Sequence, residues 1–198
     1  MPTTNKERNG RKPEFPVDEI FLDRWSPRAM SGEKISKKEI MSLFEAARWA
    51  PSAYNGQPWR FIYALRETPQ WEPIYGLMSE FNQQWTKNAS ALIVVISQNN
   101  FEHNGQPSIT HSFDAGAAWE NLALQGSFLG YVTHGMSGFD YGKAKKVLGI
   151  PEDYTVEAMI AIGKPGKKED LPDGMREREI PSPRKNIKEI VFEGKFRK

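Results

Sequence analysis

The chain has 198 residues, a formal net charge of +2 and no cysteine. This length fits one domain with a sizeable core, the near-neutral charge gives no bias towards nucleic acid, and the lack of cysteine excludes disulfides and a thiolate nucleophile. The longest purely apolar run, residues 91–96, is too short to cross a bilayer, and the N-terminus has no signal-peptide pattern. We therefore expect a soluble, cytoplasmic protein that binds neither nucleic acid nor a membrane.

Residues 1–16 are polar and contain prolines, which predicts a flexible N-terminal arm in front of a single domain at residues 17–198. A short helix is expected at residues 17–24, and Pro27 stops it. The pentapeptide that follows contains Arg24, Ser26 and Arg28, whose guanidinium and hydroxyl groups offer several donors for an anion such as phosphate. A solvated basic turn has the same composition, so both interpretations remain open here.

A capping box at Ser36 and Glu39 predicts a helix that ends near Ala50, because Pro51 cannot continue a helical hydrogen-bond ladder. The loop between Pro51 and the next strand carries neutral donors and acceptors and no metal-ligating side chain. Its candidate ligand-binding residues are Ser52, Tyr54, Asn55, Gly56 and Gln57. Such a loop suits a planar, uncharged, heteroatom-rich ligand, although it also fits an ordinary helix-to-strand turn.

The remaining pattern alternates strands and helices. Strands are predicted at residues 59–65, 91–97 and 155–163, and the continuous apolar run of the second indicates a strand covered on both faces. Helices are predicted at residues 71–85, 113–129 and 141–148. Gly135 and Gly138 lie in a turn after a further strand and let the main chain approach a ligand closely. Residues 164–198 form a basic tail with little periodicity.

Taken together, these motifs resemble the nitroreductase family over roughly residues 17–194. The resemblance rests on Arg24-x-Ser26-x-Arg28, the Pro51-Ser52-Ala53-x-Asn55-x-Gln57-Pro58-Trp59 motif, Asn82, the stretch from Gly130 to Asp140, and Arg184. It implies an α+β fold with a central mixed or antiparallel sheet flanked by helices. It also implies an intertwined homodimer with one FMN at each end of the interface, in which the tail at residues 164–198 wraps the partner subunit.

The resemblance further implies a role for each matching residue. Arg24 and Ser26 meet the FMN phosphate, with Arg184 or Lys185 completing the anion site; Arg28 lies near N1 and O2, and Asn82 meets the pyrimidine edge. The main chain at Ser137 and Gly138 donates to N5 and O4, and residues 52–57 come from the partner subunit. The full expected set is Arg24, Trp25, Ser26, Arg28, Pro51, Ser52, Ala53, Asn55, Gln57, Asn82, Met136, Ser137, Gly138, Arg184 and Lys185.

The implied activity is an FMN-dependent oxidoreductase that uses NADH or NADPH to reduce nitroaromatic, quinone or related small acceptors by a ping-pong mechanism, with no catalytic protein residue. Proton donation by His111 or His134 stays open. Two departures from the family pattern are Trp85, where many relatives carry a lysine, and Ala53, where many carry a second serine. The alternatives are a flavin-binding protein without turnover, a flavin-dependent dehydrogenase or dehalogenase, and a binding module without cofactor.

Overall fold

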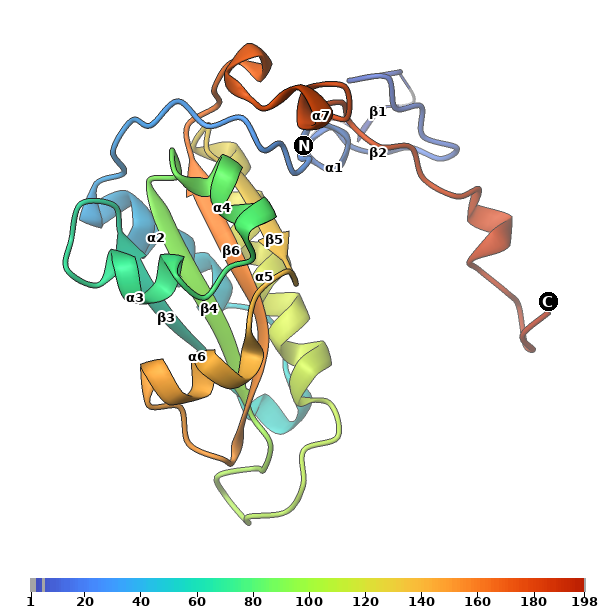
Figure 1. Ribbon diagram of the computed structural model, residues 1–198. Helices are drawn as coiled ribbons and strands as arrows, with labels where there is room; N and C mark the ends of the chain where they lie inside the picture. Colours follow the sequence, from blue (N-terminus) through green and yellow to red (C-terminus); the bar gives the residue numbers. More distant parts are fainter. Residues whose placement is uncertain (1–2, 5, 198) are drawn as a thin grey trace.

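The computed structural model describes residues 3–4 and 6–197. A four-stranded antiparallel sheet in the order β3-β4-β6-β5 forms its centre (Figure 1). The strands are β3 (Trp59–Leu65), β4 (Ala91–Gln98), β5 (Val132–Met136) and β6 (Tyr154–Gly163). Helices flank both faces, so the predicted α+β class is confirmed, and so are the three long strands expected from the apolar pattern.

The sheet separates two hydrophobic cores, and the inner strand β4 contributes side chains to both. Its side chains alternate, so that Leu92 and Val94 face one core and Ile93 and Val95 face the other. Helices α3 (Trp71–Tyr75), α4 (Glu80–Thr86) and α6 (Tyr141–Leu148) contribute to the first core, and α2 (Lys37–Arg48) and α5 (His111–Phe128) to the second. Residues 91–97 are all buried, as expected for a strand covered on both faces.

Helix α2 shows how local signals set the boundaries of an element. The Ser36 side chain accepts a hydrogen bond from the Glu39 amide, and the Glu39 carboxylate accepts one from the Ser36 amide, which is the predicted capping box. The helix ends at Arg48, two residues earlier than predicted. Pro51 disfavours helical dihedrals at the residue before it, so the last turn frays early.

The single helix predicted at residues 71–85 is wrong. The structure has two helices, α3 and α4, because the intervening chain leaves the helical path to pair with the loop after β5. The Ser79 amide donates to the Gly138 carbonyl at 3.0 Å, and the Asp140 amide donates to the Leu77 carbonyl at 2.9 Å. Ser79 then caps α4. Long-range pairing therefore overrides the local helical pattern.

The helix predicted at residues 17–24 is also wrong in its first half. Val17–Asp18 forms strand β2, which pairs with β1 (Thr3–Thr4), and α1 covers only Ile20–Asp23. The segment before residue 17, expected as a flexible arm, makes defined contacts in the structure. Arg8 donates two hydrogen bonds to Asp23, at 2.8 and 2.7 Å.

The small residues at the start of α5 divide between two environments. Ala115 and Ala118 are buried in the second core, whereas a side chain added at Gly116 would meet no atom within 4 Å. Phe113, one turn earlier, is 80% exposed. This side of α5 is therefore left open in the single chain.

The tail after β6 contains only short helical turns: Lys168–Asp170, α7 (Asp173–Arg176) and Ile187–Glu189. It crosses the molecule near α1 and then extends away from the sheet (Figure 1). Its apolar residues Ile180, Ile190 and Val191 are each at least 60% exposed. Within the part of the chain that the structure describes, no helix is long and apolar enough to span a bilayer.

Candidate functional site

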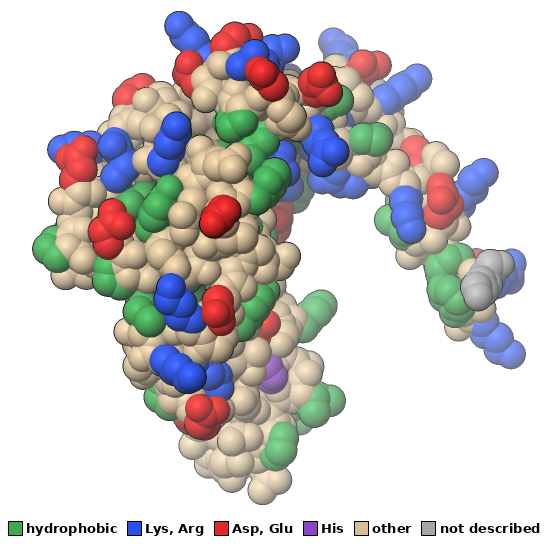
Figure 2. Space-filling model, viewed as in Figure 1, with side chains coloured by type: hydrophobic (Ala, Val, Ile, Leu, Met, Phe, Trp, Pro, Cys, Tyr) green, Lys and Arg blue, Asp and Glu red, His purple; other side chains and the backbone are tan. Residues whose placement is uncertain are grey.

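Five arginines surround one hollow of about 220 Å³, which we call the anion pocket. Its lining residues are Arg11, Arg24, Trp25, Ser26, Arg28, His134, Arg178, Ile180, Ser182 and Arg184. No carboxylate is among them, so the pocket concentrates positive charge and suits an anion such as phosphate. Figure 2 shows Lys and Arg side chains gathering where the tail leaves the rest of the molecule. The predicted meeting of Arg184 with the motif at residues 24–28 is present in the structure.

Arg11 holds the two sides of the anion pocket together. Its Nη1 donates to the Leu22 and Arg24 carbonyls at 3.1 and 2.7 Å, and its Nε donates to the Ser182 carbonyl at 3.1 Å. Burial, together with the charges of Arg184 and Arg24, lowers the pKa of Arg11. The sequence analysis missed this residue because it lies in the polar N-terminal segment, where no local pattern marks it.

Glu179 lies in the tail and supports the segment that carries Arg28. The sequence analysis missed this residue as well. Its Oε1 accepts hydrogen bonds from the amides of Arg28 and Ala29 at 2.6 and 2.7 Å. On the far side of the segment, the Ser31 amide donates to the Lys164 carbonyl at 3.0 Å. Residues 28–31 are thus held between Glu179 and the end of the sheet. A glutamate within a run of charged tail residues gives no sequence signal for this contact.

His134 on β5 connects the anion pocket to the sheet. Its Nδ1 lies 3.0 Å from the Pro27 carbonyl oxygen, which can only accept, so Nδ1 carries the hydrogen. Burial lowers the pKa of His134, and the charge of Arg28 lowers it further, against the Pro27 and Ser26 carbonyls and Glu179, which raise it. The neutral ring packs on Trp85 with 4.6 Å between ring centroids. His134 is therefore a half-buried contact that positions Pro27.

Asn82 and the loop after β5 form a second predicted part of the site. The Asn82 Nδ2 donates to the Gly138 carbonyl at 2.9 Å, and its Oδ1 accepts from the Trp85 indole at 3.1 Å. A Cβ atom at Gly138 would lie 2.6 Å from Asn82 Nδ2, so any larger residue there would displace the Asn82 amide. Met136 is buried, whereas Ser137 and Gly138 are exposed. The structure thus joins Asn82 to Gly138 in the loop after β5.

Trp85 departs from the family pattern for a structural reason. Its side chain is 2% exposed and belongs to the first core, between Asn82 and His134. The buried indole donates a hydrogen bond to Asn82, which in turn holds Gly138 in the loop after β5. It offers no charge to a ligand.

The loop at residues 51–57 lies at the opposite end of the sheet from the anion pocket. It leads into Trp59, which pairs with Ser97 and through it with Thr155 on β6, whereas His134 pairs with Ala161. The stretch of β6 from Thr155 to Ala161 spans roughly 20 Å. Within one chain, the predicted set Pro51, Ser52, Ala53, Asn55 and Gln57 is therefore not brought to the arginines.

The backbone of this loop is shaped by its own polar groups. Tyr54, Asn55 and Gln57 have φ values of 52°, 53° and 45°, a left-handed conformation that non-glycine residues adopt rarely. The Ser52 hydroxyl accepts from the Gln57 amide at 3.0 Å, and the buried Asp114 carboxylate accepts from the Ala53 amide at 3.1 Å. The loop is thus held in one strained shape that presents its neutral groups to the outside.

His111, the other histidine considered for proton transfer, lies at that same far end. Its Nδ1 is 2.7 Å from the Ser97 hydroxyl and 3.4 Å from a carboxylate oxygen of Glu157. Ser112 also donates to Glu157, at 2.7 Å. The ring is therefore held by polar neighbours at the start of α5, remote from the anion pocket of its own chain.

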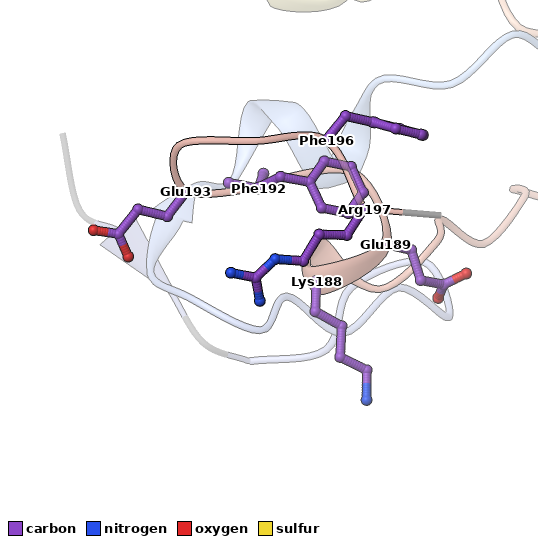
Figure 3. Close-up of a pocket in the computed structure, with 7 residues that line it drawn as sticks. Lys188, Glu189, Phe192, Glu193, Phe196 and Arg197 are labelled. Atoms are coloured by element: carbon purple, nitrogen blue, oxygen red, sulfur yellow. The ribbon is translucent and has the colours of Figure 1, made fainter.

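Two other hollows involve the tail. Lys185 and Arg184 line one of about 270 Å³ beside the N-terminal segment, so Arg184 borders both this hollow and the anion pocket, whereas Lys185 borders only this one. A hollow of about 720 Å³ is formed entirely by residues 188–197, among them Lys188, Phe192 and Phe196 (Figure 3). None of the predicted site residues lines it, so it is a curl of the tail itself. Among the residues of the two described ranges, no acidic or histidine cluster could hold a metal ion.

Comparison with known proteins places this geometry in a family. The model of the Nitroreductase family matches residues 22–72 and 64–164. An Archaeoglobus fulgidus protein, provisionally named NADH dehydrogenase/NAD(P)H nitroreductase, is 32% identical over 157 residues, which cover 77% of this chain and 87% of that protein. The DrgA protein of Synechocystis is 29% identical and covers 80% of this chain and 87% of its own.

Solved structures agree with this comparison. An oxidoreductase whose crystal structure is described as containing FMN is 47% identical, with a TM-score of 0.93 over 97% of this chain and 98% of its own. A provisionally assigned nitroreductase of Desulfovibrio desulfuricans, solved in complex with FMN, shares the fold at a TM-score of 0.70 and 22% identity, over 90% of this chain and 96% of its own. The family match covers most of the chain and includes the arginine motif, the 51–57 loop, strand β5 and the loop that follows it, and this chain belongs to the nitroreductase family.

Proposed function

We propose that this protein is an FMN-dependent oxidoreductase that uses NADH or NADPH to reduce small electron acceptors, such as nitroaromatic compounds and quinones, by a ping-pong mechanism. Family membership supports the proposal, as do relatives named NAD(P)H nitroreductases and a 47% identical structure that contains FMN. The observation that carries it is a pocket lined by five arginines and by His134 of β5, the strand that leads into the exposed residues 137–138.

The anion pocket fits the phosphate end of FMN. Arg24, Ser26 and Arg184 offer charge-assisted or hydroxyl donors from two directions, and the pocket has no lining carboxylate that would repel the phosphate. The Nε of Arg28 is buried and has no hydrogen-bond partner in the part of the chain that the structure describes. Such an orphaned donor beside a basic hollow is consistent with a site made for an anionic ligand.

The neighbouring edge of β5 fits the ring end. Ser137 and Gly138 are exposed, so their main-chain N–H groups are available to ring heteroatoms such as N5 and O4. Asn82 fixes the position of Gly138 through its 2.9 Å hydrogen bond and keeps a second amide hydrogen for the pyrimidine edge. The main-chain amides and the Asn82 side chain are uncharged, which suits the uncharged ring of oxidised FMN.

When bound, FMN supplies the redox chemistry that links the nicotinamide to the acceptor. The residues of this chain bind and orient the two ends of the cofactor. With FMN bound, Arg28 would hold its positive charge near N1 and O2 and so favour the reduced, anionic ring. No protein nucleophile or general base is needed, and neutral His134 holds the arginine segment in place through Pro27.

A homodimer completes the site in this proposal. The neutral 51–57 loop lies at the far end of its own sheet, so an intertwined partner would bring its loop to the anion pocket of the first subunit. The apolar tail residues Ile187, Ile190 and Val191, left exposed in the single chain, would cover the partner's surface. Open space at Gly116 on α5 leaves room for close packing of a second subunit.

An absorbance spectrum tests the oxidoreductase assignment. We expect the purified protein to show the absorbance of bound oxidised flavin, to bleach when NADH or NADPH is added without oxygen, and to recover on addition of a quinone. Bound flavin that neither nicotinamide reduces would favour a flavin-binding protein without turnover. A protein that takes up no FMN would contradict the proposal as a whole.

Mixing two variants that each bind FMN weakly tests the contribution of the partner loop. Arg24→Ala removes the phosphate contact, and Asn55→Ala combined with Gln57→Ala removes loop groups. If the loop acts on the other subunit, a heterodimer of the two variants regains one intact site of its two. The mixture then contains sites that bind FMN with wild-type affinity, which neither variant has alone. No recovery from subunits shown to exchange would mean that each site is built from one chain.

A further inference from the structure

We propose that Glu179 is a positioning residue for Arg28 that also sets the net positive charge of the anion pocket, a proposal that rests on the FMN site proposed above. The inference concerns a tail residue that does not line the pocket. It acts on the arginine segment from behind.

The geometry supplies the positioning role. A single carboxylate oxygen of Glu179 accepts the amides of two successive residues, Arg28 and Ala29, at 2.6 and 2.7 Å. Two backbone amides that converge on one anion fix the local dihedrals of the chain, and with them the direction in which the Arg28 side chain leaves it. The Glu179 side chain is 4% exposed, so water does not compete for these hydrogen bonds.

The charge supplies the second role. The other carboxylate oxygen of Glu179 lies 4.0 Å from Nη1 of Arg28, and this oxygen is buried without a hydrogen-bond partner among the described residues. At this separation the buried carboxylate and the partly exposed guanidinium attract each other. Glu179 therefore offsets part of the positive charge that Arg28 brings to the pocket. Arg28 still cannot collapse onto Glu179 as a close bidentate pair, because the carboxylate's other oxygen is engaged by the backbone.

The surrounding structure separates the two roles. Residues 28–31 are also held by the bridge between Met30 and Pro165 and by the hydrogen bond from Ser31 to Lys164. A glutamine at position 179 keeps an oxygen that accepts both amides and removes only the negative charge. An alanine removes both the acceptor and the charge. These two substitutions therefore test different parts of the proposal in a segment that has other supports.

The experiment compares Glu179→Gln and Glu179→Ala with Glu177→Gln, a change at an exposed glutamate two residues away on the same tail. The probes are FMN and inorganic phosphate, each titrated into the protein stripped of cofactor. The third measurement is the midpoint potential of each variant fully loaded with FMN. We expect Glu179→Gln to lower the Kd for both anions by about threefold to tenfold, because one opposing charge near the pocket is lost. The midpoint potential should become more positive, since the uncompensated Arg28 favours the reduced, anionic ring.

We expect Glu179→Ala to bind FMN more weakly than Glu179→Gln, so that the glutamine restores what the alanine loses. Glu177→Gln should match the wild type in all three measurements. A wild-type potential and unchanged anion affinity in Glu179→Gln would overturn the proposal, because a purely structural residue would behave in this way. If the wild type reduced no acceptor and bound no FMN, while Glu179→Gln still tightened phosphate binding, the oxidoreductase proposal would fail and the role of Glu179 in the anion pocket would stand.

Discussion

Substituting Arg184 by glutamine tests the phosphate anchor most directly. In the structure, Nη1 of Arg184 donates to the carbonyls of Ser182 and Pro183, at 3.2 and 3.1 Å. The remaining donors of its guanidinium are available to an anion in the pocket that Arg184 lines. Glutamine keeps a hydrogen-bond donor and removes the charge, so the variant isolates the electrostatic part of the contact.

The expected loss follows from the exposure of the side chain. A hydrogen bond to a charged group contributes about 1.5–3 kcal/mol. Arg184 is exposed, which places it at the lower end of this range because water and salt screen the interaction. A loss of about 1.4 kcal/mol corresponds to a tenfold rise in the Kd for FMN. The ratio between variant and wild type should shrink as salt is raised.

The assay is a titration of FMN into stripped protein, followed by the quenching of flavin fluorescence at low and at physiological ionic strength. Lys185→Gln is the matched control, since this neighbouring cation borders the adjacent hollow and not the anion pocket. We expect it to bind FMN as the wild type does. Equal affinities of Arg184→Gln and wild type would refute the reasoning, and an equal loss in the two variants would show that general tail charge is responsible.

Four further predictions concern other parts of the site. Arg24→Ala should weaken FMN binding by about 1.5–3 kcal/mol, and full retention of FMN after dialysis of that variant would contradict the phosphate contact. Gly138→Ala should lower the free energy of unfolding by about 1–3 kcal/mol in a denaturant titration. The new Cβ would lie 2.6 Å from Asn82 Nδ2 and break the hydrogen bond from this amide to the Gly138 carbonyl. An unfolding midpoint equal to that of the wild type would mean that the loop relaxes freely. The pKa of His134 in the folded chain lies below its ordinary value of 6.5, so below that pH the unfolded chain binds a proton that the folded chain does not. The free energy of unfolding should therefore fall as pH drops below about 6.5. His134→Asn should make this dependence on pH weaker, and an unchanged dependence would mean that other groups cause it. Arg28→Gln should lower the midpoint potential of bound FMN, because the positive charge that favours the reduced, anionic ring is lost, and equal potentials would mean that another cation serves the ring.

Local interactions explain what could be predicted from the sequence. The capping box at Ser36 and the apolar run of β4 depend on neighbours a few residues away, so their patterns identify a helix start and a doubly covered strand correctly. The same holds for residues 24–28, which lie together in the anion pocket because they are adjacent in the chain. The grouping with Arg184 came from the family resemblance, and the structure places that residue in the pocket wall.

Tertiary structure alone decided the rest, because those features pair residues that are remote in sequence. The helix predicted at residues 71–85 breaks where the Ser79 amide donates a hydrogen bond to the Gly138 carbonyl. No local sequence pattern indicates a hydrogen-bond partner so far along the chain. Arg11 and Glu179 act through hydrogen bonds to backbone groups remote from them in the sequence, and exposed charged residues elsewhere in the chain have the same sequence context. The distance between the 51–57 loop and the anion pocket is likewise set by strand register, since only the pairing of β6 with both neighbours puts these two polar regions at opposite ends of one sheet.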